Sequence, residues 1–337
     1  MRIVTGQVCA FAVAGMLLAT PAAAEEWRFN NPLPDSRPET AELNQFADDV
    51  NAKLGDKHSI KMYNGGSLGL KNADALRFLP KGGVEMSLVW ANYLGRDAPA
   101  LSSVFVQGAI STEDELQKVL PVVQQIYEEE FGNWGVTAAG YLAIPMLSVS
   151  VFCSDEPINA LADLKGKKLR VWAKDQVETF TRLGVAAQII PQEDMYVALK
   201  TGVVDCALYP ALYAHTVSLQ EVAKYASFLY PMASGPYVLG VATDTWENTD
   251  EEVKAAIQEA AKAAWDRTNQ YDDDYERELA ARDKLGEQGV EWLPDFPASD
   301  RDEFLAAVSE TWAMLAEEAG GNGPEYRQRV LEALGRN

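Results

Sequence analysis

The sequence is poor in the side chains that most often bind metals or carry out catalysis. Its 337 residues include only 3 cysteines and 2 histidines, with no HExxH motif, CxxC pair, GxGxxG fingerprint or phosphate-binding loop. Basic residues are also scarce: 29 Lys and Arg face 50 Asp and Glu, and the formal charge is −21. Nucleic acid and anionic membranes bind clustered positive charge, so this surface disfavours both. We therefore expect no cofactor, no metal and no nucleic-acid partner.

Long apolar runs are absent too, apart from one near the N-terminus. Arg2 precedes an apolar run at 8–19, which is shorter than the ~20 residues that span a bilayer. Small residues at 21–24 follow, and then two glutamates. This order is typical of a secretory signal peptide cut after Ala24, and Cys9 lies too deep in the run for a lipoprotein anchor. Cleavage leaves 313 residues with a side-chain charge of −22, exported and not membrane-embedded.

Two cysteines, Cys153 and Cys206, remain after that cleavage. An oxidising compartment permits a disulfide between them. Neither has a partner at CxxC spacing. The interpretation we favour is two small buried apolar residues in separate strands, with the disulfide as the alternative.

Helical and strand patterns alternate along the remaining chain. Leu43, Phe46, Val50 and Leu54 recur at helical spacing. Thr112 and Glu115 form a capping box for a helix to about residue 131. Strands are predicted at 28–30, 59–63, 85–90, 136–142, 147–152, 169–172, 187–190, 204–208, 224–229 and 237–242, with helices at 37–54, 73–79, 112–131, 299–318 and 324–334. Two more helices are predicted, one through Phe180 and Leu183 to Gly184 and one through Met195 and Leu199 that ends at Gly202. Such alternation predicts an α/β fold with mixed sheets.

One further helix is predicted at 249–286, which consists almost entirely of helix formers. At this length it would extend roughly 55 Å, more than one small domain. We expect a long helix that bridges two lobes, with a kink near Asn269 as the alternative. No linker is evident, so the lobes should be joined by several crossings. The predicted lobes are 25–148 with about 236–270, and 149–235 with about 271–337.

A GxSxG pattern at 65–69 lies between a predicted strand and a helix, as in a hydrolase nucleophile elbow. His215 is the only histidine after Ser67, and no acid of evident role accompanies it. We favour a glycine-rich turn. The three aspartates at 272–274 lack EF-hand spacing, so we interpret them as a solvated acidic face.

The most specific pattern lies at 161–210. It reads LADLKGKKLRV, a helix to Leu183 and Gly184, and then IPQEDMYVALKTGVVDCALYP. This resembles the DctP-type solute-binding proteins of tripartite ATP-independent periplasmic (TRAP) transporters, which carry DLKGxKxR and then P…E…Y.AL..G.VDG…P. FADDV at 46–50, SLG at 67–69 and TW at 245–246 also agree, and the resemblance covers essentially all of 25–337.

The resemblance implies a two-lobed periplasmic binding protein fold with mixed sheets. It also implies a function: a periplasmic receptor that closes on a small organic carboxylate and delivers it to the small and large TRAP membrane subunits. Such a protein is not an enzyme. The alternatives are an exported enzyme acting on a small carboxylate, for which no nucleophile and base pair is evident, and an ABC-type solute receptor.

Arg170 falls at the family's ligand-carboxylate arginine. A guanidinium gives two parallel charge-assisted hydrogen bonds to one carboxylate and fixes its plane, whereas lysine supplies charge without that orientation. By the same resemblance, Arg170 is the residue on which ligand binding should depend.

Four other positions depart from the family's sialic-acid binders. Ser150 falls where those proteins carry a second arginine, Tyr209 where they carry asparagine, and Trp90 and Tyr93 where they carry an acid and an arginine. Trp172 follows the arginine strand. Polar groups are lost and aromatic surface is gained, which favours a monocarboxylate with an apolar or aromatic body. Weaker hydrogen-bonding candidates are Asn31, Asn92, Gln192 and Tyr213.

Overall fold

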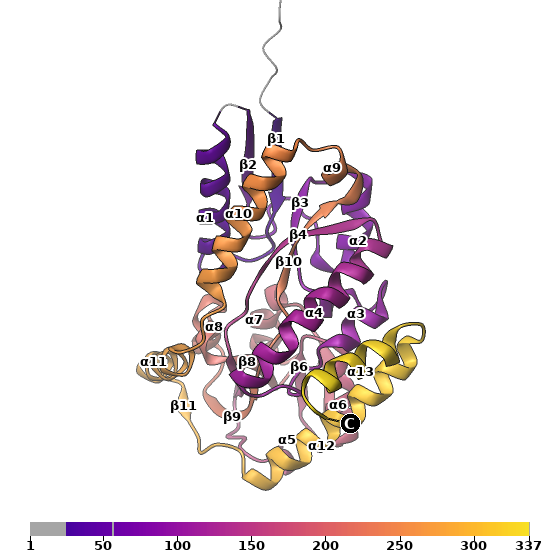
Figure 1. Ribbon diagram of the computed structural model, residues 1–337. Helices are drawn as coiled ribbons and strands as arrows, with labels where there is room; N and C mark the ends of the chain where they lie inside the picture. The colour runs from indigo at the N-terminus through magenta and orange to yellow at the C-terminus, as the bar shows by residue number, and fades with distance from the viewer. Residues whose placement is uncertain (1–24, 56, 337) are drawn as a thin grey trace, which may run out of the picture.

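Two mixed β-sheets, each flanked by helices, form the molecule in the computed structural model, which describes residues 25–55 and 57–336 (Figure 1). The predicted signal peptide lies outside the described residues. The strands are β1 (Glu25–Asn30), β2 (His58–Tyr63), β3 (Met86–Val89), β4 (Val136–Leu142), β5 (Leu147–Cys153), β6 (Lys168–Val171), β7 (Ala186–Ile189), β8 (Cys206–Pro210), β9 (Tyr225–Met232), β10 (Tyr237–Ala242) and β11 (Glu291–Trp292).

Helices follow most of these strands. The α-helices are α1 (Pro38–Leu54), α2 (Ala75–Phe78), α3 (Pro99–Val104), α4 (Glu113–Asn133), α5 (Leu161–Leu164), α6 (Lys174–Arg182), α7 (Gln192–Lys200), α8 (Ala211–Ala214), α9 (Thr243–Glu247), α10 (Glu251–Thr268), α11 (Asp274–Glu287), α12 (Ala298–Ala319) and α13 (Gly323–Ala333). Short 3₁₀ turns are η1 (Asn72–Asp74), η2 (Leu79–Lys81), η3 (Ala91–Leu94), η4 (His215–Val217) and η5 (Leu219–Glu221). The predicted α/β fold is confirmed, and short α3, α5, α8, α9 and β11 were not predicted.

The first sheet has the strand order β2-β1-β3-β10-β4. β1 is parallel to β2 and β3, whereas β10 is antiparallel to β3 and β4. Helix α1 packs on this sheet through its predicted apolar face, which is buried. Phe46 of this face meets Phe29 of β1 edge to face, with ring centroids 6.0 Å apart. Thr112 caps α4 as expected, since its hydroxyl accepts the Glu115 amide.

The second sheet has the order β11-β9-β5-β8-β6-β7. β6 runs parallel to both β7 and β8, and β5 lies antiparallel to β8 and β9. On one side Tyr230 of β9 stacks on Phe304 of α12, which also meets Phe180 of α6. This packing joins the C-terminal helices to the second sheet.

The chain passes between the two sheets three times. β4 of the first sheet leads directly into β5 of the second, β9 returns to β10, and α10 beside the first sheet leads to α11 beside the second (Figure 1). The third crossing is hydrogen-bonded to the first. The Ala143 amide donates to Thr268 of α10, and the Met146 amide donates to Asp274 of α11. The crossings thus form one connected region between the lobes.

The expected continuous helix at 249–286 is wrong. It is divided into α10 and α11, with a break at 269–273 where the alternative placed a kink. Asn269 leaves helical geometry at φ −81° and ψ 52°. The sequence there is NQYDD, and short polar side chains such as Asn and Asp compete with the helix for backbone hydrogen bonds. The break lets α11 turn toward the second sheet.

The GxSxG segment is a turn, as favoured from the sequence. Gly65, Gly66 and Gly69 all have φ between 64° and 69°, a left-handed conformation that glycine adopts without a steric penalty. The amides of Gly65 and Gly66 donate to the carbonyls of Leu33 and Asn31. The turn therefore fastens the end of β2 to the segment that follows β1.

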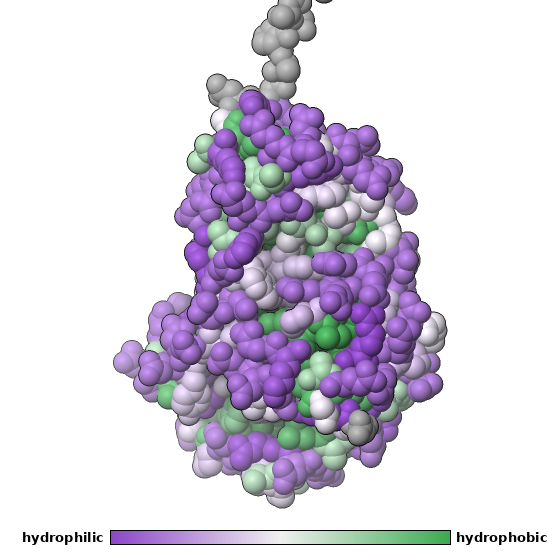
Figure 2. All heavy atoms as spheres, viewed as in Figure 1, coloured by the Kyte–Doolittle hydropathy of each residue, from purple (hydrophilic) through white to green (hydrophobic). Residues whose placement is uncertain are grey.

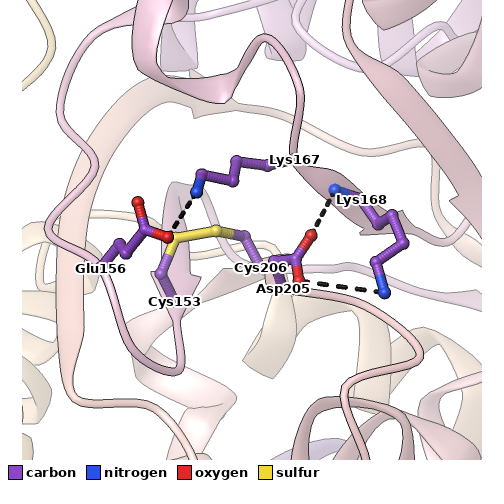
Figure 3. The surroundings of a disulfide bond; sticks show 6 residues. All are labelled: Cys153, Glu156, Lys167, Lys168, Asp205 and Cys206. Atoms are coloured by element: carbon purple, nitrogen blue, oxygen red, sulfur yellow. Dashed lines mark hydrogen bonds and ion pairs between the residues drawn. A yellow bond between two sulfur atoms is a disulfide. The ribbon is translucent and has the colours of Figure 1, made fainter.

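Cys153 and Cys206 form a disulfide, which corrects the interpretation favoured from the sequence (Figure 3). They lie directly opposite each other on antiparallel β5 and β8, with Cα atoms 4.1 Å apart. Their separation of 53 residues gives no hint of this pairing. Only the strand order of the second sheet brings them together.

The face seen in Figure 2 is mostly hydrophilic, with apolar side chains gathered in limited areas. In the part of the chain that the structure describes, no helix combines the length and apolarity needed to cross a bilayer. Those same residues include no group of three or more His, Cys, Asp or Glu side chains arranged to hold a metal ion.

Candidate ligand-binding site

Arg170 of β6 is buried, with 1% of its surface exposed. Its Nε donates to the Ile190 carbonyl at 2.9 Å and its Nη1 to the Leu208 carbonyl at 3.1 Å. No carboxylate of the described residues lies within 4 Å of the guanidinium. Burial lowers the pKa of Arg170, although the neighbouring Tyr93, Tyr209 and exposed Glu193 oppose this effect. The two carbonyls hold the guanidinium in place without neutralising it.

Two other predicted residues leave the same face of the second sheet as Arg170. Arg170 pairs with Ala207 on β8, and Ser150 of β5 pairs with Tyr209, two residues further along β8. Residues two apart on a strand share a face, so the three side chains point the same way. The Tyr209 ring centroid is 5.8 Å from Arg170 Cζ, and the buried Ser150 Oγ has no hydrogen-bond partner among the described residues.

Trp172 forms the other flank of Arg170, with its ring centroid 5.6 Å from Cζ. Gln176 of α6 fixes this corner, because its side chain accepts the Trp172 amide at 3.0 Å and donates to the Tyr230 hydroxyl at 3.1 Å. The Trp172 indole N–H is buried and has no acceptor in the described parts of the chain. The second lobe thus presents a guanidinium between two aromatic rings.

The first lobe supplies an aromatic row of its own. Trp90, at the end of β3, meets Tyr93 edge to face at a centroid distance of 4.7 Å and lies 6.5 Å from Tyr237 of β10. Its indole N–H donates to Ser234 at 3.2 Å, which fixes the ring. Burial raises the pKa of Tyr93 to about 12, partly offset by Arg170, so Tyr93 lies within the electrostatic reach of that guanidinium.

A second buried arginine lies at the start of α1. Arg37 is 4% exposed and pairs with Glu39 through two hydrogen bonds of 3.0 and 2.8 Å. The Tyr213 hydroxyl of α8 donates to the same carboxylate, and Arg37 Cζ lies 3.4 Å from the Tyr213 ring centroid. Burial alone would raise the pKa of Glu39, but Arg37 outweighs it and holds that pKa below its usual range. This cluster, Arg37–Glu39–Tyr213, joins the two lobes.

The weaker candidates differ in what they contact. Asn31 donates to Thr40 and Asn64 and accepts the Leu33 amide, so its side chain holds a turn together. Gln192 accepts the Tyr209 hydroxyl at 2.8 Å and thereby orients that ring. Asn92 donates to the Phe105 carbonyl at 2.8 Å and keeps an unpartnered buried Oδ1 among the described atoms.

Sequence reasoning missed three residues of this region: Arg37, Glu39 and Tyr237. Charged residues beside a proline at a helix start ordinarily lie at the surface, and Tyr237 has the pattern of a core strand. The sequence feature that could have indicated Arg37 and Glu39 is the pair of opposite charges in RPE. Such pairs are common on protein surfaces, so this feature does not predict burial. In the structure Tyr213 of α8, which is far along the chain, lies against Arg37 and Glu39.

The family model described as bacterial extracellular solute-binding protein, family 7 (DctP), matches residues 29–319. The chain belongs to this family. It is a TRAP transporter substrate-binding protein of the DctP type, which confirms the resemblance seen in the sequence and selects the TRAP type over an ABC-type receptor. Members of the family are extracytoplasmic binding proteins that take small organic acids and work with TRAP membrane subunits.

Among similar proteins, a solute-binding protein of Chromohalobacter salexigens is 28% identical over 270 residues, which cover 76% of this chain and 77% of the relative. A TRAP solute-binding protein from Roseobacter denitrificans with bound β-D-glucuronate has a TM-score of 0.77 at 24% identity, covering 93% and 100% of the two chains. One from Desulfovibrio salexigens with bound orotic acid has a TM-score of 0.81 at 20% identity, covering 92% and 98%. At these identities the solved structures establish the fold alone.

Proposed function

We propose that this protein is a periplasmic receptor for a monocarboxylate with an apolar or aromatic body, which it delivers to TRAP membrane subunits. The observation that carries the proposal is Arg170: it is 1% exposed, held by two carbonyls, and has no carboxylate partner among the described residues. An uncompensated buried charge is costly to a folded protein. A ligand carboxylate that pairs with Arg170 removes that cost.

The charges around Arg170 favour a ligand with one negative charge. Arg37 is the other buried cation of the region, and its two hydrogen bonds go to Glu39. That pair is neutral overall, which leaves one positive charge for the ligand. A second carboxylate would have to displace Glu39 or lie unpaired in a buried site, and both are unfavourable.

The aromatic rings favour a ligand with a ring or other apolar body. Trp172 and Tyr209 flank Arg170 in the second lobe, and Trp90 with Tyr93 forms the facing row in the first. Orotic acid and β-D-glucuronate, bound by two proteins of the same fold, each carry a single carboxyl group on a ring. These ligands belong to those proteins; orotic acid has a planar unsaturated ring, whereas glucuronate is a hydroxylated sugar acid, and both carry one carboxylate for one cation.

A thermal-shift screen of the purified protein tests this function. Ring monocarboxylates should raise the melting temperature, whereas their neutral primary amides should not, because only the carboxylate pairs with Arg170. A ligand at a hundred times its Kd stabilises by about 2.7 kcal/mol, which such a screen detects. Equal stabilisation by an acid and its amide, or a response restricted to dicarboxylates, would refute the proposal. Conversion of a bound acid into product would favour the enzyme alternative instead.

The proposed function requires that the protein is exported to the periplasm. The signal peptide predicted at 1–24 would carry the chain to the periplasm, where an oxidising environment permits the Cys153–Cys206 disulfide. Intact mass measurement of periplasmic protein should give a chain beginning at Glu25 with two hydrogens fewer than the dithiol form. Retention of residues 1–24 would contradict the predicted cleavage.

Closure of the two predicted lobes over the ligand would be the binding motion. The connections between the sheets, at 143–146, 233–236 and 269–273, are where the chain would bend. Small-angle scattering with and without a bound acid should show a smaller radius of gyration for the bound form. An unchanged radius at saturation would argue against closure.

A further inference from the structure

Tyr93 and Tyr237 are the tyrosines of the first-lobe aromatic row, on either side of Trp90. Tyr237 lies close enough to Tyr93, Tyr209 and the Arg37–Glu39 pair to interact with all of them electrostatically. Tyr93 in turn interacts with Arg170 and Tyr209 of the second lobe. Both phenols therefore belong to the polar surroundings of Tyr209 and the Arg37–Glu39 pair, beside Arg170.

The hydroxyls in this region differ in whether the protein already uses them. Tyr209 donates to Gln192, and Tyr213 donates to Glu39. The hydroxyls of Tyr93 and Tyr237 have no hydrogen-bond partner within residues 25–55 and 57–336. Neither hydroxyl oxygen is among the fully buried unpartnered atoms, so both are accessible to a bound molecule.

Both groups are neutral at any physiological pH. Burial is the largest influence on each and raises the pKa of both phenols well above 10. A neutral phenol can donate one hydrogen bond and accept another. Two such hydroxyls suit an uncharged oxygen substituent, a hydroxyl or a carbonyl, because they supply hydrogen bonds without a positive charge.

We propose that Tyr93 and Tyr237 form a second polar pole of the ligand site, which binds a hydroxyl or carbonyl oxygen on the ring of a monocarboxylate held by Arg170. The proposal rests on the proposed function and narrows the ligand class to oxygen-substituted ring acids. The aromatic rings of Trp90, Trp172 and Tyr209 would contact the ring faces between the two poles.

The test is calorimetry with matched acids: benzoate with its 3- and 4-hydroxy derivatives, and cyclohexanecarboxylate with its 3- and 4-hydroxy derivatives. For the wild type, at least one hydroxy acid should bind about tenfold more tightly than its parent, because a site built to hydrogen-bond an oxygen rejects the analogue that lacks it. Tyr237→Phe, Tyr93→Phe or the double variant should reduce this ratio to near one, because phenylalanine keeps the ring and removes only the hydroxyl.

Tyr141→Phe is the matched control, because its hydroxyl donates to the Gln124 carbonyl and its ring packs on Trp265, away from Arg170. It should keep the wild-type ratio. The proposal is overturned if the double variant keeps the ratio, or if wild type binds the parent acids and prefers no hydroxy derivative. It is also overturned if wild type binds none of these acids. Failure of the proposed function is distinct, since it would appear as Arg170→Met binding the parent acids as tightly as wild type.

Discussion

The two lobes each contribute one buried arginine, and the surroundings of the two differ. Arg37 in the first lobe has a carboxylate partner in Glu39 and a tyrosine ring against its guanidinium. Arg170 in the second has two backbone carbonyls and two rings near it, but no carboxylate within 4 Å among the described residues. Both are at least 96% buried.

We propose that this difference separates a structural cation, Arg37, from one that binds a ligand, Arg170. In the Arg37–Glu39 pair the protein itself supplies the counter-charge, so the pair is complete without a ligand. At Arg170 the backbone fixes the geometry of the guanidinium and leaves its charge for another molecule. The residue type is the same, so the local partner decides the role. Four experiments can break or sharpen this comparison.

The largest effect should come from Arg37→Met. The change leaves Glu39 buried with Tyr213 as its remaining side-chain donor, and breaking a buried pair in this way costs about 3–5 kcal/mol. Urea unfolding followed by circular dichroism measures the loss. Lys224→Met is the control, since its pair with Asp155 is exposed and should contribute at most about 1 kcal/mol. Equal losses in the two variants would mean that the Arg37 pair is no more important than a surface pair.

Arg170→Met should lower carboxylate affinity at least 100-fold, about 2.7 kcal/mol, measured by calorimetry. In contrast with Arg37→Met, its stability without ligand should equal or exceed that of wild type, because a buried charge lacking a counter-ion is removed. Arg170→Lys keeps a charge but loses the fork, so its affinity should fall between the two. A stability loss as large as that of Arg37→Met would mean that Arg170 is also a structural cation.

Tyr213→Phe should cost about 1–2 kcal/mol of folding stability, because Glu39 loses one buried donor while the ring remains against Arg37. Since Tyr213 follows β8 and Glu39 begins α1, the lost bond is one between the lobes. Denaturant unfolding reports the cost. Tyr141→Phe provides a comparison within the first lobe. No destabilisation would show that Arg37 alone satisfies Glu39.

The smallest effect concerns pH. Arg37 holds the pKa of Glu39 below its usual range, so the stability that this carboxylate contributes is present at neutral pH and is lost as pH falls below about 4.5. In Arg37→Met, burial dominates and raises that pKa, so the variant should gain stability as pH falls from 7 toward 4. The gap between the two proteins should narrow by at most about 1.4 kcal/mol per pH unit. Urea titrations at several pH values measure it, and a constant gap would refute the assignment.

The sequence predicted most of the fold because the signals involved are local. The apolar spacing of α1 and the Thr112 capping box depend on residues a few positions apart, and both are present in the structure. The break between α10 and α11 was placed correctly only as an alternative. Helix propensity summed over 249–286 favours continuity, whereas the crossing between lobes favours the break at NQYDD.

For the site, the sequence indicated Arg170 and its aromatic neighbours through a spaced motif within about fifty residues. It did not indicate Arg37, Glu39 or Tyr237. Their roles depend on contacts such as Tyr213 to Glu39, across 174 residues, and local sequence carries no record of such distances. Asn31 was a candidate because it follows the first strand of the sheet. The sequence does not show the three hydrogen bonds that its side chain makes within the protein.

By itself, the sequence determined the family, the α/β alternation and the scarcity of catalytic and metal-binding side chains, because composition and short-range periodicity are properties of the chain. Only the tertiary structure decided that Cys153 pairs with Cys206, that Arg37 is neutralised and that Arg170 is not. These are questions of which groups share a buried space. In a low-dielectric interior the nearest partner dominates the energy of a charge, and that partner is set by the packing of strands and helices distant in sequence.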